Sequence, residues 1–181
     1  MQTVFSLDTI PLLPKPIALT IGSFDGLHRG HAALLKKLKE AAGFGTAAVI
    51  SFSNHPKQIL SPHNAPRLIC TPEQKLELLQ NCGIDLTIIL PFDQKLSITP
   101  YTDFLKSVHE MLPFSRLVLG KGATLGKDKE GAEAQIKAYG AKLHFTVNYI
   151  DKIDFVSSSG IRLALQEGQI TQAEEMLGRP I

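Results

Sequence analysis

Residues 17–31 read Ile17-Ala18-Leu19-Thr20-Ile21-Gly22-Ser23-Phe24-Asp25-Gly26-Leu27-His28-Arg29-Gly30-His31, an apolar run followed by a turn rich in glycine. The apolar run closes at Gly22 and predicts a buried strand of a parallel sheet. Three leucines at helical spacing, with lysines on the opposite side, predict a helix over residues 31–42. A strand, a glycine-rich turn and a helix in this order favour an α/β fold that binds its ligand at the turn.

Strand and helix patterns continue to alternate along the chain. Apolar runs predict four more strands, at residues 46–52, 86–90, 117–119 and 143–149. Helical spacing and start signals predict helices at residues 72–81, 100–112, from just after 131 to 139, 158–166 and 171–177, with loops at 54–66 and 120–131. Because parallel strands need crossover connections, we expect a Rossmann-like open parallel sheet with helices on both faces.

The length and composition are those of one ordinary globular domain. The chain has 181 residues, 44% hydrophobic and 20% charged, with a formal net charge of +2. This charge is too small to indicate a nucleic-acid or membrane partner. Cys70 and Cys82 have neither the number nor the spacing of a disulfide framework or a zinc site. With no signal-peptide pattern and no membrane-length apolar run, we expect one cytoplasmic domain over residues 1–181.

The turn itself has the features of a phosphate site. Gly22, Gly26 and Gly30 let backbone approach a bulky anion without Cβ clashes. The helix that follows directs its free N–H groups and its positive dipole end at the turn. His28 and His31 lie three residues apart, so both can face one side of the helix start and donate to phosphate oxygens.

Residues 22–31 match the pattern G-x-F-D-G-x-H-x-G-H. This pattern resembles the H-x-G-H signature of the nucleotidylyltransferase superfamily, in the form of its FAD synthetase branch, the adenylyltransferase half of bacterial bifunctional riboflavin kinase/FMN adenylyltransferases. The resemblance implies the nucleotidylyltransferase fold, with His28 and His31 as catalytic residues that contact ATP phosphates and the departing pyrophosphate. The resemblance also implies nucleotide contacts from the rest of the turn: Gly22, Ser23, Phe24, Asp25, Gly26 and Gly30. For Asp25, bracing the turn is the other interpretation.

A second motif lies near the carboxyl end of the chain. Ser157, Ser158 and Ser159 stand at a predicted helix start, where hydroxyls cap free N–H groups and can donate to phosphate. Arg162 lies one turn further on and offers a fork of donors. The segment 156–162 resembles the I-S-S-T-x-I-R motif of the same family. We therefore predict catalytic roles for Ser159 and Arg162 and nucleotide binding by Ser157 and Ser158; plain helix capping is the alternative.

Two further segments extend the resemblance. Residues 51–56 resemble a T-F-x-P-H-P segment that borders flavin and nucleotide in the family, which adds Asn54, His55 and Pro56 to the binding residues, with Asn54 where proline is usual. Residues 165–180 resemble the family's A-L-x-x-G…L-G-R-P tail, where its adenylyltransferase domain usually ends. We expect a single adenylyltransferase domain, with the riboflavin kinase domain absent from this chain.

The loop after residue 120 departs from the family pattern. The usual G-x-[DN]-F-x-F-G becomes residues 120–126 here, so Gly120 stays as a binding residue. Gly122 replaces the Asp or Asn, and Ala123 and Leu125 replace two phenylalanines that help to hold flavin and adenine in the family. The departure bears on the acceptor, because aromatic pairs add about 0.5–1.5 kcal/mol beyond burial.

The sequence thus predicts an FMN adenylyltransferase that transfers AMP from ATP to FMN, giving FAD and pyrophosphate. The resemblance implies Mg²⁺ on the phosphates, and we assign no protein metal ligand. Two alternatives remain: a nucleotidyltransferase for another phosphorylated acceptor, and a nucleotide- or flavin-binding protein without turnover. We predict no nucleic-acid or membrane partner and no particular oligomeric state.

Overall fold

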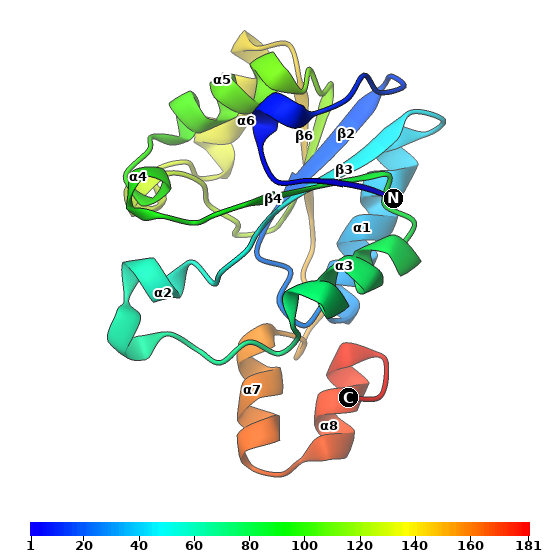
Figure 1. Cartoon of the computed structure of the whole chain (residues 1–181), viewed down its shortest axis with the longest axis vertical. Coiled ribbons are helices and arrows are strands. Elements are labelled where there is room, and N and C mark those ends of the chain that lie inside the picture. Colours follow the sequence, from blue (N-terminus) through cyan, green and yellow to red (C-terminus); the bar gives the residue numbers. More distant parts are fainter.

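A six-stranded parallel sheet forms the centre of the structure, a computed structural model that describes all 181 residues (Figure 1). Its strand order is β1-β4-β3-β2-β5-β6, and every neighbouring pair is parallel. The strands are β1 (Gln2–Val4), β2 (Ile17–Ile21), β3 (Thr46–Phe52), β4 (Leu86–Leu90), β5 (Arg116–Gly120) and β6 (Thr146–Ile150). The predicted fold class and all five predicted strands are confirmed. The edge strand β1 was not predicted.

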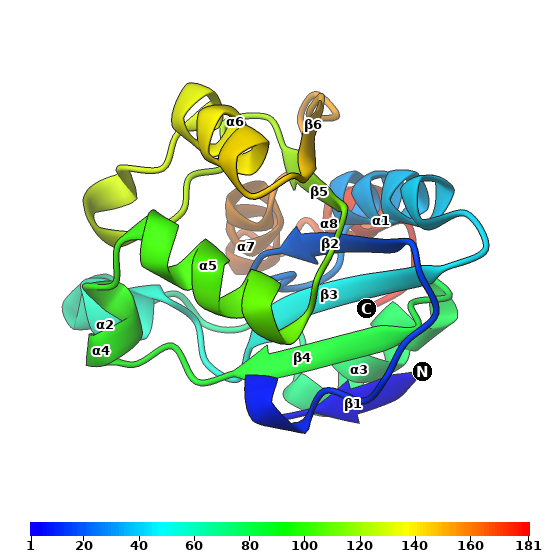
Figure 2. The ribbon, with the colours of Figure 1, turned by 90° about the horizontal axis from the view of Figure 1, so that it is seen from above.

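Helices cover both faces of this sheet, as predicted (Figure 2). Side chains of β2 alternate between the faces: Ile17, Leu19 and Ile21 pack toward one core, and Ala18 packs toward the other. The first core includes α5 (Tyr101–Met111) and α6 (Glu133–Lys142), and the second includes α1 (Arg29–Ala42) and α3 (Pro72–Asn81). Each face therefore has its own hydrophobic core.

The last two helices form a separate pair, α7 (Ser158–Gln166) and α8 (Ile170–Leu177), at the bottom of the view in Figure 1. They have a small core of their own, made of Ile161, Ala164, Ala173, Met176 and Leu177. The predicted start of α7 is confirmed, and Ser157 caps it by accepting a hydrogen bond from the Gly160 N–H at 3.0 Å.

Some boundaries and connections differ from the prediction. The segment 54–66, predicted as a loop, contains α2 (Lys57–Leu60) and a 3₁₀ turn at Pro62–Asn64. A second four-residue helix, α4 (Gln94–Ser97), was not predicted. The last strand starts at Thr146 instead of residue 143, because α6 runs on to Lys142 and His144 takes a positive φ of 62°. None of the helices combines the length and the apolar character needed to cross a membrane.

The strand order places a ligand crevice. From β2 the chain moves outward through β3 to β4, and from β5 it moves the other way to β6. The loops after β2 and β5, which are neighbours, therefore leave the sheet in opposite directions and open a gap beyond its carboxyl edge. Both segments that the sequence singled out, residues 22–31 and 120–131, begin at this point.

Candidate functional site

The turn after β2 is tightly folded and mostly buried. Gly26 has a φ of +76°, and a Cβ there would lie 2.8 Å from the Ile69 side chain, so only glycine fits. Phe24 also takes a positive φ, of 48°, and its ring is only 2% exposed within the core under α1. Phe24 therefore anchors the turn from inside. The turn ends at His28, which caps α1; the helix begins at Arg29, two residues before the predicted start at residue 31.

The two histidines of the turn stack on each other. Their ring centroids are 3.8 Å apart with an interplanar angle of 11°, and the Phe24 ring meets His31 edge-on at 5.1 Å. The His28 Nδ1 accepts a hydrogen bond from the His31 backbone N–H at 3.3 Å, so the His28 proton lies on Nε2. A Cβ at Gly30 would lie 3.2 Å from the His28 ring, which accounts for glycine there. The predicted placement of both histidines on one side of the helix start is confirmed.

Both imidazoles are neutral at physiological pH. Burial lowers the pKa of His31 to about 3, with a further contribution from His28 beside it. Burial also lowers the pKa of His28 below its usual value, although its backbone hydrogen bond and Asp25 act in the opposite direction. The stacked pair therefore consists of neutral hydrogen-bond donors at the positive end of α1.

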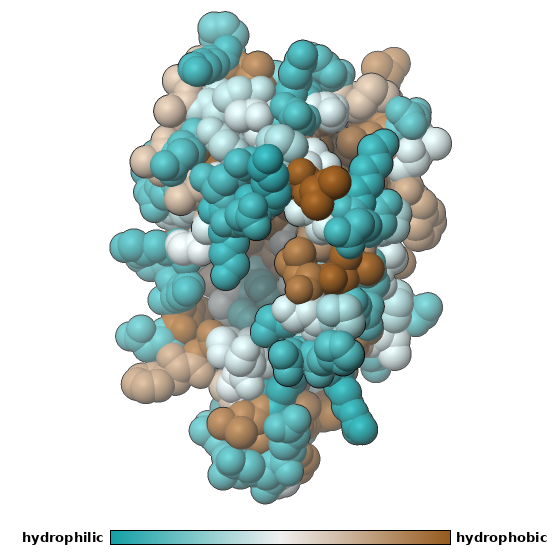
Figure 3. All heavy atoms as spheres, turned by 90° about the vertical axis from the view of Figure 1, so that its left-hand side faces the viewer, coloured by the Kyte–Doolittle hydropathy of each residue, from teal (hydrophilic) through white to brown (hydrophobic).

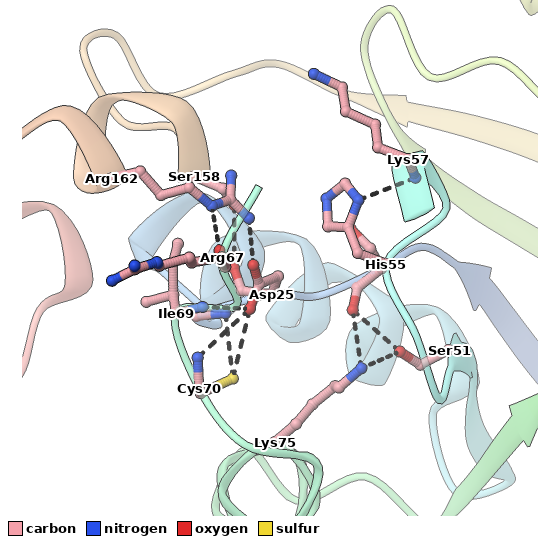
Figure 4. Close-up of polar contacts among 12 residues, drawn as sticks. Asp25, Ser51, His55, Lys57, Arg67, Ile69, Cys70, Lys75, Ser158 and Arg162 are labelled. Carbon is pink, nitrogen blue, oxygen red and sulfur yellow. Dashed lines mark hydrogen bonds and ion pairs between the residues drawn. The ribbon is translucent and has the colours of Figure 1, made fainter. Parts of the chain in front are cut away.

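Asp25 links the turn to two other segments of the chain. Its carboxylate, 3% exposed, accepts hydrogen bonds from the backbone N–H groups of Ile69, at 3.0 Å, and Cys70, at 3.4 Å, and pairs with the Arg162 guanidinium. The Ser158 hydroxyl donates to the Asp25 carbonyl at 3.0 Å (Figure 4). Of the two roles open for Asp25 from sequence, the bracing role is thus observed.

The second motif meets the first through these contacts. Besides Asp25, Arg162 donates from Nε to the Arg67 carbonyl at 2.8 Å. Arg179, just after α8, donates to the Gly26 carbonyl at 2.8 Å. Ser159 is exposed, and its hydroxyl makes no hydrogen bond in the protein. The structure therefore brings Ser158 and Arg162 into contact with the first turn, with Ser159 between them in α7, while the contacts of these residues with phosphate stay predictions.

Lys75 is a functional-site neighbour that the sequence analysis missed. It comes from α3, is 8% exposed, and donates to the Phe52 carbonyl at 2.7 Å and to the Ser23 carbonyl and Ser51 hydroxyl at 3.3 Å each (Figure 4). Burial lowers the pKa of this ammonium below its usual value. One buried cation thus ties the carboxyl ends of β2 and β3 together. No signal in the local pattern separates it from the solvated lysines of other helices.

The segment after β3 is fixed in a similar way. The Asn54 amide pairs with the backbone of Phe92, donating to its carbonyl at 2.9 Å and accepting from its N–H at 2.8 Å. Asn54 therefore joins the ends of β3 and β4, which explains an amide where proline is usual. His55 accepts from the Lys57 N–H at 3.1 Å, and its pKa is lowered, first by burial and then by Arg162. Pro56 borders the large cavity described next.

A cavity of about 600 Å³ opens beyond the carboxyl ends of β2, β3 and β4. Three phenylalanines, Phe52, Phe92 and Phe104, give it an aromatic wall, and α2 and α4 contribute Leu60 and Leu96. Figure 3 looks onto the side that carries α2 and α4 and shows hydrophobic residues gathered beside a hollow. Most of these residues were not predicted, because they come from short helices and strand ends spread over half of the chain.

The first residues of the turn after β2 form part of the cavity lining. Gly22 and Ser23 line it, whereas His28 and His31 stand at the other end of the turn. The loop after β5 contributes Ala123, Leu125 and their neighbours to the lining. The predicted binding residue Gly120 does not line the cavity, and a Cβ at this position would meet the Leu34 side chain of α1 at 3.7 Å. No group of three or more His, Cys, Asp or Glu side chains lies close enough to hold a metal ion.

Comparison with known proteins gives consistent matches. The model of the FAD synthetase family matches residues 11–160. A bifunctional riboflavin kinase/FMN adenylyltransferase of Listeria monocytogenes is 32% identical over 90% of this chain and 54% of its own length. Its counterpart from Pseudomonas fluorescens is 30% identical over 99% of this chain and 60% of its own length. The chain thus spans little more than half the length of these relatives.

A solved structure has the same fold. The structure titled "Crystal Structure of Macrolide-efflux Protein from Streptococcus pneumoniae" superposes with a TM-score of 0.86, at 24% identity, over 99% of this chain and 60% of that one. At this identity the match shows a shared fold and nothing about function. The superposition also includes α7 and α8, which lie mostly beyond the residues that the family model matches.

Replacing Lys75 tests the bridge between the strand ends. Lys75→Met leaves the buried Phe52 carbonyl without a donor, which costs about 1–3 kcal/mol of unfolding free energy. Urea unfolding measures the loss, with Lys106→Met on the exposed face of α5 as the control. Equal stability of Lys75→Met and wild type would contradict the bridging role.

The buried neutral His31 predicts a pH-dependent stability. The unfolded chain binds a proton at this group near pH 6.5, whereas the folded chain does not until about pH 3, so stability is lost as pH falls through this window. The slope is about 1.4 kcal/mol per pH unit, so between pH 8 and pH 5 wild type should lose about 2 kcal/mol more than His31→Gln. Urea unfolding at both pH values gives this difference, and the exposed His63→Gln variant should retain the wild-type dependence.

Proposed function

The chain belongs to the FAD synthetase family, and from this premise we propose that it transfers the AMP group of ATP to FMN, giving FAD and pyrophosphate. One observation carries the proposal. A stacked histidine pair at a helix start and an aromatic-walled cavity lie at the two ends of one turn, Gly22 to His28. This arrangement suits a phosphate-bearing donor at one end and a flat ring system at the other.

On the donor side, neutral imidazoles and helix N–H groups offer hydrogen bonds to the triphosphate. His28 Nε2 carries a proton that it can donate, and His31 is stacked beside it. Ser159, exposed and without a partner, and the Arg162 guanidinium face the same region from α7 in this proposal. Donors fixed in advance stabilise charge that develops on the leaving pyrophosphate without reorganising during the reaction.

On the acceptor side, the cavity suits a planar aromatic ring. Its volume of about 600 Å³ is typical of small-molecule sites, and Phe52, Phe92 and Phe104 supply the aromatic wall. The loop after β5 contributes Ala123 and Leu125, where the family has phenylalanines. In this chain the aromatic contacts would thus come from strand ends and α5 rather than from that loop.

The reaction needs alignment more than acid–base chemistry. The phosphate of FMN is anionic near neutral pH, so its oxygen can attack the α-phosphorus of ATP in line without a general base. Mg²⁺ neutralises phosphate charge in such transfers. Because the protein offers no cluster of three metal-ligating side chains, we infer that the ion is held mainly by phosphate oxygens and water.

A different phosphorylated acceptor is the second candidate, and the altered residues Gly122, Ala123 and Leu125 favour it. Incubation with ATP, Mg²⁺ and either FMN or other phosphorylated acceptors, followed by mass spectrometry, separates the candidates. FAD supports our proposal, another adenylylated product supports the second candidate, and binding without pyrophosphate release indicates a binding protein. We propose that residues 1–181 form one adenylyltransferase domain. We also propose a cytoplasmic location, with which the two free cysteines are compatible.

Removing either histidine tests the donor side. His28→Ala and His31→Ala should each slow FAD formation about 10²-fold or more, the scale of losing one transition-state donor. Steady-state assays of pyrophosphate release measure this decrease. His144→Asn serves as the control, because His144 lies just before the amino end of β6, at the edge of the sheet opposite the site. Near-normal turnover in both variants would contradict the role of the pair.

Ser159→Ala tests the second motif without disturbing the fold. Because this hydroxyl is exposed and makes no hydrogen bond in the protein, its loss should leave stability unchanged. One lost hydrogen bond to phosphate should weaken ATP binding roughly tenfold and leave FMN binding unaffected. Calorimetric titration with ATP and with FMN gives both affinities; unchanged ATP affinity would exclude the contact.

A further inference from the structure

Two charged side chains reach an otherwise uncharged cavity. Of the 17 residues that line the acceptor cavity, only Asp128 and Lys129 are charged, and both are exposed. They follow one another in the loop after β5. Nothing in the transfer mechanism described above uses either of them.

Their backbone is held in a conformation that favours glycine. Asp128 has a φ of 52° and Lys129 a φ of 59°, both in the left-handed region. Glycine adopts this region at no steric cost, whereas residues with a Cβ are strained there, lysine more than aspartate. Strained residues of this kind persist only where the surroundings fix them, and they cluster at ligand sites.

The surrounding loop does fix them. Leu125 and Gly131 exchange both backbone hydrogen bonds at 3.0 Å, which closes the loop across its base. The Lys127 N–H donates to the Thr99 carbonyl at 3.0 Å, and the Glu130 carboxylate accepts from the Tyr101 N–H at 3.0 Å. Neither Asp128 nor Lys129 makes a side-chain hydrogen bond or an ion pair of its own. The frame is fixed and both charges are available to a ligand.

The chemistry of the cavity suggests what they contact. The wall is aromatic at Phe52, Phe92 and Phe104, so the apolar end of a flat ring system belongs inside and its polar end belongs beside the charges. The polar end of a flavin is an imide edge, with one N–H between two carbonyl oxygens. A carboxylate accepts from such an N–H, and an ammonium donates to such a carbonyl.

We propose that Asp128 and Lys129 determine acceptor specificity by hydrogen bonding to the imide edge of the flavin ring. This inference rests on the proposed function, because it names what the acceptor side recognises. The Asp128 carboxylate accepts a hydrogen bond from the ring N–H, and the Lys129 ammonium donates one to a neighbouring carbonyl of the ring. The strained pair thus replaces, at the rim, part of the recognition that the altered loop residues Ala123 and Leu125 do not provide.

A flavin that lacks the N–H tests Asp128 directly. FMN methylated at the imide nitrogen should bind wild type roughly tenfold more weakly than FMN, the loss expected for one charged hydrogen bond. In Asp128→Gly the two flavins should bind within about twofold of each other. Quenching of flavin fluorescence measures all four affinities. Equal discrimination by wild type and Asp128→Gly, or none by wild type, would overturn the proposal.

Lys129 is tested against a neighbouring lysine. Lys129→Gly should weaken FMN binding several-fold and leave ATP binding unchanged, whereas Lys127→Ala, a lysine of the same loop that does not line the cavity, should change neither. A selective effect of Lys129→Gly on ATP affinity would overturn the proposed contact. Both glycine variants should unfold at the wild-type urea concentration or above it, since they remove strain; a lower midpoint would assign the side chains a structural role instead.

These measurements keep the two proposals distinct. Fluorescence quenching reports binding without turnover, so it tests the imide contact even if no FAD is formed. Failure to form FAD with discrimination intact would remove the proposed reaction alone. FAD formation without discrimination would remove the imide contact alone.

Discussion

The buried carboxylate of Asp25 is the contact on which the site depends. Three segments meet at Asp25: the turn after β2, the backbone at residues 69–70, and α7, which brings Arg162 to the carboxylate and Ser158 to the backbone carbonyl. A charge at 3% exposure needs all of these partners, and breaking a buried pair by removing one member costs about 3–5 kcal/mol. Because Arg162 and Ser158 belong to α7, the same contact that shapes the turn also sets where the second motif stands.

Strand order then decides how the two halves of the site share one turn. The gap between β2 and β5 opens where the chain reverses its direction of travel across the sheet, so the turn after β2 stands at the crevice beyond the carboxyl edge of the sheet. Its first residues border the aromatic cavity, and its last residue caps α1. Lys75 holds the wall of that cavity to the turn through Phe52 and Ser23. A donor and an acceptor bound at the two ends would thus be aligned by a rigid backbone, which is the main requirement for in-line transfer.

The sequence predicted what local patterns encode. Strands β2 to β6 and the long helices repeat apolar residues over enough positions to be recognised, and the placement of His28 and His31 on one side of a helix start follows from their spacing. Elements of three or four residues, β1, α2 and α4, are too short for any period to show. The partners of Asp25, Asn54 and Lys75 could not be predicted either, because each lies 23 to 137 residues away and only the folded sheet brings them together.

Burial also gives the histidine pair a property that the sequence could not show. Neutral imidazoles donate hydrogen bonds without adding charge, so in the proposed function the start of α1 would attract phosphate through oriented donors and the helix dipole. The guanidinium of Arg162 in the second motif is already paired with the Asp25 carboxylate. If ATP binds as proposed, a site built in this way would hold its phosphates less tightly before the reaction than a lysine cluster would. Its stabilisation then grows as charge collects on the leaving pyrophosphate, and that difference between the ground state and the transition state is what lowers a barrier.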